Sequence, residues 1–179
     1  MGGRGGALGR LADRVVPGRG RRRAERALAD ALGEGVWRRA HDRVHRSVDR
    51  FHQVLDGVVA DDAPGARDGL VPALEAVAAD LVDLLGTVEV LCVRAQAVAP
   101  SAGLDVPRVP PAAAAEQGLP DELHRRLSRA GTAAATASEA ATMARVSARA
   151  GALDVALDRA RAASRAVATA REHLGTAPR

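Results

Sequence analysis

The sequence predicts an all-α protein, an up-down four-helix bundle of long amphipathic helices with a proline-rich crossover loop. Residues that favour strands are scarce, since aromatic residues make up 1% of the chain and isoleucine and tyrosine are missing. Alanine, leucine, arginine and glutamate, which favour helices, dominate instead. Apolar residues also recur with alternating spacings of four and three, as in bundle and coiled-coil helices. The 179 residues suffice for about one domain.

The first helix is expected over about residues 21–61, after a flexible basic arm at 1–20. Its second half carries an apolar stripe that faces one side of the helix. Gly33 and Gly35 precede this stripe and predict a kink or a break there. The stripe consists of Trp37, His41, Val44, Val48, Phe51, Leu55 and Val58.

The second helix is expected over about residues 68–98, with Pro72 in its first turn and Pro100 beyond its end. The short connection before it predicts an antiparallel pair with the first helix. Residues 99–119 hold four prolines and form a long connection that permits a crossover. The stripe consists of Leu70, Leu74, Val77, Leu81, Leu84, Val88, Leu91, Ala95 and Val98.

The last part of the chain predicts either two helices or one. A single helix over 120–174 would be about 80 Å long, roughly twice the second helix, and would leave an apolar arm without a neighbour. A break near Gly131 or Gly151 is therefore favoured, which gives helices over about 120–150 and 152–174 within a bundle domain of residues 21–179. Three long helices are the alternative.

Charge is unevenly distributed along the chain. Residues 1–26 hold eight arginines and two acids, residues 27–119 eight arginines and fourteen acids, and residues 120–179 ten arginines and six acids. The net charge is +4 and there is no lysine, isoleucine, asparagine or tyrosine. These missing residues share AT-rich codons, so a GC-rich bacterial genome accounts for the use of arginine alone. Lysine-dependent Schiff-base and Walker-loop chemistry are excluded.

The basic arm is a candidate anion-binding site for nucleic acid or an anionic membrane. No aromatic residue interleaves with its arginines, so base stacking is not indicated. The alternative is that the arm is solvated or faces the acidic middle of the chain. The candidate residues are Arg19, Arg21, Arg22, Arg23 and Arg26.

Three histidines of the first helix form the one candidate metal site. His41, His45 and His52 fall along one edge of the apolar stripe, and residues at i and i+4 can reach the same ion. The neighbouring helix offers further ligands at Asp80, Asp83, Glu89 and Cys92. The paired Glu-x-x-His pattern of di-iron bundles is absent, so structural histidines are the alternative.

A non-enzymatic protein–protein interaction or scaffold module is the function that this sequence favours. Its alanine-rich helices are expected to pair with a protein partner or a second copy, and the exposed Ala/Thr/Ser face at 132–142 is the candidate contact. No catalytic motif, cofactor site or small-molecule site is evident. Cys92 is the only cysteine, so an internal disulfide is excluded. With no signal peptide or membrane span evident, a cytoplasmic location is expected.

Overall fold

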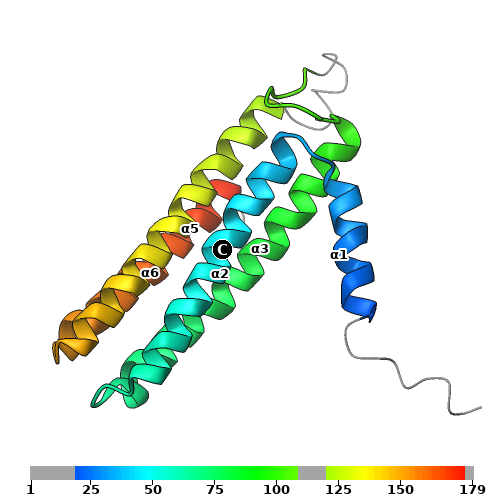
Figure 1. Ribbon diagram of the computed structural model, residues 1–179. Coiled ribbons are helices and arrows are strands. Elements are labelled where there is room, and N and C mark those ends of the chain that lie inside the picture. Colours follow the sequence, from blue (N-terminus) through cyan, green and yellow to red (C-terminus); the bar gives the residue numbers. More distant parts are fainter. Residues whose placement is uncertain (1–18, 109–119, 176–179) are drawn as a thin grey trace, which may run out of the picture.

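The computed structural model describes residues 19–108 and 120–175, and within these ranges the protein is helical and has no strand (Figure 1). The all-α prediction is confirmed. No helix in these ranges is both long enough and apolar enough to cross a lipid bilayer. The helices are α1 (Arg19–Leu32), α2 (Val36–Asp61), the π-helical turn η1 (Ala66–Leu70), α3 (Val71–Val98), α5 (Pro120–Arg149) and α6 (Leu153–Leu174).

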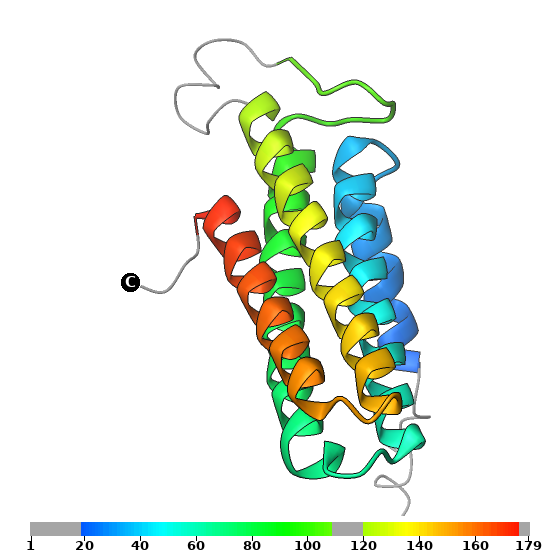
Figure 2. The ribbon, with the colours of Figure 1, turned by 90° about the vertical axis from the view of Figure 1, so that its left-hand side faces the viewer.

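Four long helices lie side by side as two antiparallel hairpins, α2 with α3 and α5 with α6 (Figure 2). The first hairpin stacks on the second with α2 beside α5 and α3 beside α6, so that α3 and α5 are diagonal neighbours. Asp61, at the end of α2, lies beside Arg145 near the end of α5, so α2 and α5 run parallel. The connection between α3 and α5 therefore joins diagonal helices, as a crossover does.

Glycines set the breaks between helices. Gly33 has a φ of 61° and separates α1 from α2, which confirms a break where the sequence predicted a kink or break. Gly151, with a φ of 77°, separates α5 from α6. The alternative of three long helices is wrong, because α5 and α6 are separate helices. Gly131 is buried within α5 and does not break it. Helix α1 already includes Arg19, whereas residues 1–18 of the predicted arm lie outside the described residues.

Large and small side chains are divided between the two hairpins. The first hairpin buries Trp37, Phe51, Leu74 and Leu81 completely. The second hairpin buries mainly alanine, which removes less apolar area from water but lets helix backbones approach closely. Its buried alanines are Ala130, Ala134, Ala137, Ala141, Ala144, Ala148, Ala156, Ala160, Ala163 and Ala170.

The start of α2 is fixed by the segment that follows α3. Gly35 occupies the N-cap and supplies no side-chain cap, but the Val36 amide donates to the Ser101 hydroxyl at 3.2 Å. Beside it, the Trp37 indole Nε1 donates to the Ala99 carbonyl at 2.8 Å. A remote serine thus satisfies an amide that a local cap would otherwise satisfy. These bonds tie together the ends of α2 and α3.

Candidate interaction groove

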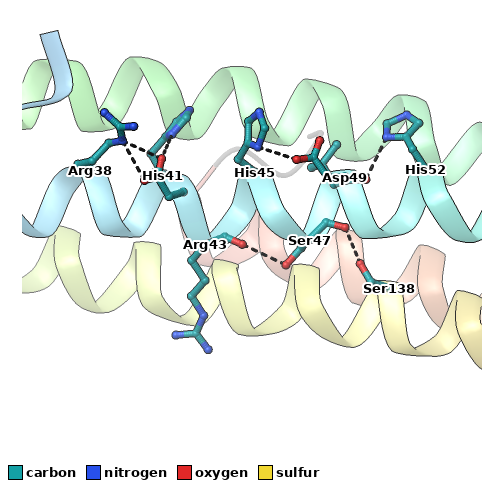
Figure 3. A network of polar contacts seen from close by, with 10 residues as sticks. Arg38, His41, Arg43, His45, Ser47, Asp49, His52 and Ser138 are labelled. Atoms are coloured by element: carbon teal, nitrogen blue, oxygen red, sulfur yellow. Dashed lines mark hydrogen bonds and ion pairs between the residues drawn. The ribbon is translucent and has the colours of Figure 1, made fainter. Parts of the chain in front are cut away.

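The three predicted metal-site histidines lie along α2 but have separate partners (Figure 3). His41 is 5% exposed, and its Nδ1 lies 3.1 Å from the Asp42 carboxylate. The Nδ1 of His45 lies 3.0 Å from Asp49, and that of His52 lies 3.0 Å from the Val48 carbonyl. The rings of His41 and His45 are 5.9 Å apart between centroids. Each histidine therefore has a structural partner on its own helix.

The expected additional metal ligands do not join these histidines. Asp80 and Asp83 lie 2.8 and 3.9 Å from the Arg171 guanidinium of α6, instead of facing α2. Cys92 is fully buried, and burial raises the pKa of its thiol to about 12, which keeps it protonated. No group of three or more histidine, cysteine or acidic side chains in residues 19–108 and 120–175 is arranged to hold a metal ion. The metal-site prediction is therefore not supported.

The predicted anion-binding arginines belong to a helix. Arg22, Arg23 and Arg26 are exposed on α1 and fall within one face of it, whereas Arg19 and Arg21 are helical positions whose side chains lie outside the described residues. The opposite face of α1 packs its leucines on the bundle. The basic segment is thus displayed from a docked amphipathic helix.

A groove runs between the parallel helices α2 and α5. At its base the Ser138 hydroxyl donates to the Ser47 carbonyl at 2.7 Å, and both serines are buried (Figure 3). Such short side chains let the two helices approach closely and leave the longer side chains standing on either side. The groove has a volume of about 650 Å³ and is lined by Arg43, Arg46, Ser47, Arg50, Ala135, Ser138, Glu139, Thr142 and Met143.

The α2 wall of this groove carries three arginines that are all exposed. Arg43 donates to the Thr132 hydroxyl at 3.1 Å across the groove. Arg46 and Arg50 make no ion pair or side-chain hydrogen bond with any other residue that the structure describes. Glu139 is the one acidic residue among the side chains that line the groove. The groove is therefore strongly positive, and two of its charges are uncompensated.

A second hollow of about 390 Å³ continues the groove toward the ends of α2 and α5. It shares Arg50 and Thr142 with the first hollow. The apolar side chains of Met143, in the first hollow, and Val146, in the second, are 47% and 54% exposed. The groove thus combines basic walls with apolar surface that no described residue covers.

An ion-pair cluster closes the far end of the groove. The Arg145 guanidinium contacts the Asp61 carboxylate at 2.7 Å, and Arg149 lies 3.8 Å from it. The hydrogen bond from Arg145 lowers the pKa of Asp61, and the charge of Arg149 adds to this. These two arginines are therefore partly neutralised, unlike Arg46 and Arg50.

The predicted contact segment 132–142 has two roles in the structure. Ala134, Ala137, Ser138 and Ala141 are buried within the bundle and are not available to a partner, so the expectation of an exposed small-residue face is wrong for them. The remaining edge of the segment supplies Ala135, Glu139 and Thr142 to the groove. Arg43, Arg46 and Arg50 were not predicted as site residues, although their spacing of three and four places them on one helix face. Nothing in the sequence indicates that α5 lies beside that face.

Comparisons of this chain with protein-family models, with curated proteins and with solved structures found no match. The geometry of the groove is therefore the basis for a functional proposal.

Proposed function

We propose that this chain is a non-enzymatic protein–protein interaction or scaffold module that binds a helix of a protein partner in the α2/α5 groove. The observation that carries the proposal is that the uncompensated Arg46 and Arg50 lie beside exposed apolar side chains in two adjoining hollows of the groove. Two parallel helices with a hollow between them form a concave track that fits a third helix. The partner helix that matches it has an apolar stripe with acidic residues beside it.

Shape and charge together favour a helix over other occupants. A flat bilayer would reach the rims of the groove but not its base at Ser47 and Ser138, which are buried. A nucleic acid would engage the arginines, but none of the residues that line the groove is aromatic and able to stack on a base. Met143 and Val146, by contrast, offer apolar contacts that an amphipathic helix uses.

The test is binding of a fluorescein-labelled synthetic helical peptide of about 20 residues, with a leucine stripe flanked by glutamates, measured by fluorescence anisotropy. The variant R46E/R50E should weaken binding about tenfold or more, because two attractive contacts become repulsive and each exposed charge pair contributes about 0.2–1 kcal/mol. The matched control R22E/R23E makes the same charge change on α1 and should leave binding within about twofold.

Two outcomes would count against the groove as the binding site. Equal loss in both variants would mean that net charge alone attracts the peptide. Equal binding of a scrambled peptide of the same composition would mean that the apolar stripe has no role. Circular dichroism of each variant verifies that the helices remain formed.

A second proposed function rests on α1, which displays Arg22, Arg23 and Arg26 on an amphipathic helix. This face supports binding to a polyanion, either nucleic acid or an anionic membrane. Replacing the three arginines by alanine should reduce salt-sensitive retention on heparin, whereas R43A/R46A/R50A, which removes the same number of arginines, should reduce it less. Retention that depends only on the number of arginines removed, and not on their position, would refute a specific role for α1.

A further inference from the structure

The outer face of α3 is a second uncovered apolar surface. Val82 and Val90 are 49% and 68% exposed, and they lie eight residues apart on the same side of the helix, about 80° apart around its axis. Gly86 lies between them on that side, and a methyl group added there would contact nothing within 4 Å. This face, made of Ala79, Val82, Gly86 and Val90, is therefore an apolar ridge with little steric bulk at its centre.

Acidic side chains flank this α3 ridge. Glu75, Asp83 and Glu89 belong to a helix in which Arg94 is the one basic residue. Asp83 is 79% exposed in its side chain and lies 3.9 Å from Arg171. The side chains of Glu75 and Glu89 make no ion pair or hydrogen bond with the other residues that the structure describes. The ridge thus has the chemistry expected of the partner helix for the groove.

We infer that the helix bound in the α2/α5 groove is the α3 ridge of a second copy of this chain. This inference rests on the function proposed above and specifies its partner. The groove and the α3 face carry opposite net charge, since three arginines and one glutamate line the groove, whereas Glu75, Asp83 and Glu89 lie on a helix with one arginine. The exposed valines of the ridge complement the exposed apolar side chains of α5.

The arrangement of helices requires that the two surfaces come from different molecules. The ridge belongs to α3 and the groove to α2 and α5, and α3 is the diagonal neighbour of α5. A chain therefore cannot place its own α3 in its own groove without dismantling the bundle. Association is head-to-tail, since two different surfaces meet, so it generates a ring or an open chain of copies.

Other segments of this chain are poor candidates for the groove. The residues outside the described ranges, 1–18, 109–119 and 176–179, contain only two acids, Asp13 and Glu116. They cannot match the positive charge of the groove as α3 does. The charge distribution of the chain itself therefore favours a second copy.

Sedimentation velocity from micromolar to near-millimolar protein tests this inference. The wild type should form species larger than a monomer as concentration rises at about 0.1 M salt, and should dissociate at about 1 M salt, where charges are screened within ~3 Å. The groove variant R46E/R50E and the ridge variant E75R/E89R should each require at least about tenfold higher protein concentration to associate. The control R22E/R23E should associate as the wild type does.

Mixing the two charge-reversed variants gives the decisive measurement. The acidic groove of one and the basic ridge of the other are complementary, so an equimolar mixture should recover association that neither variant shows alone. A monomeric wild type at every concentration, or failure of the mixture to associate while both variants remain helical, would overturn the inference. If the synthetic peptide still binds to the groove in that case, the proposed function stands and only the identity of the partner is wrong.

Discussion

Replacing Ser138 tests whether α2 and α5 approach each other as closely as their hydrogen bond indicates. Ser138→Ala removes one buried hydroxyl that donates to Ser47, so it should lower the free energy of unfolding by about 0.5–1.5 kcal/mol. Ser138→Leu adds bulk where the side chain is 5% exposed, and overpacking of this kind costs typically 1–3 kcal/mol. The leucine variant should therefore be the less stable of the two, and α5 should move away from α2.

Urea denaturation followed by circular dichroism measures both changes, with Thr136→Leu as the matched control. Thr136 lies on the same helix but is exposed, so its replacement should change the free energy of unfolding by less than about 0.5 kcal/mol. In a chain of this size, 1 kcal/mol corresponds to roughly 2–4 °C in the melting temperature. Ser138→Leu with wild-type stability would refute the close approach and, with it, the account of how the groove forms.

Three further predictions concern other parts of the structure. Trp37→Phe leaves the buried Ala99 carbonyl without its indole donor, so the free energy of unfolding measured by urea denaturation should fall by about 1–3 kcal/mol. An unchanged free energy of unfolding would show that this bond does not stabilise the ends of α2 and α3. Cys92 is buried and its pKa is raised to about 12, so iodoacetamide should not label it at pH 8 in the folded protein but should label the unfolded protein readily. Fast labelling of the folded protein, measured by mass spectrometry, would contradict its burial. The pKa of Asp61 is lowered by the Arg145 hydrogen bond, so its stabilising effect is complete above the unfolded-state pKa near ~4 and is lost as pH falls through the folded-state value. Asp61→Asn should accordingly weaken the dependence of melting temperature on pH below about pH 4, and an identical acid limb in both proteins would refute this.

The helices α2 and α3 could be predicted from the sequence because large apolar residues mark the stripe that each of them buries. The second hairpin was harder, since its stripe is mostly alanine and gives little contrast between buried and exposed positions. Gly131 and Gly151 therefore looked equivalent as breaks. In the structure Gly131 is buried close to the Arg43 side chain, with an added methyl group only 3.1 Å from its Cδ, so this glycine serves packing. Gly151 adopts a positive φ that favours glycine and ends the helix.

The candidate sites could not be predicted fully, because they are formed by contacts between different helices and the spacing of residues along the sequence does not determine which helices are neighbours. The histidines of α2 do share a helical edge, as predicted. The only reason to expect metal ligands from α3 was that the two helices of a hairpin lie close together. Asp80 pairs instead with Arg171, which is 91 residues away in the sequence. Which helix lies beside α2 depends on how the chain crosses from α3 to α5, and no local pattern determines that path.

The groove follows from the same small residues that pack α5 into the bundle. Where Ser138 meets Ser47, the backbones are separated only by short side chains, so α5 does not cover the arginines of α2 at this point. Glu139 of α5 lines the same groove but makes no ion pair with Arg46 or Arg50, so these two charges remain uncompensated. Uncompensated charges of like sign contribute nothing to folding and repel each other at short range. Their placement along an apolar track supports the binding function proposed for the groove.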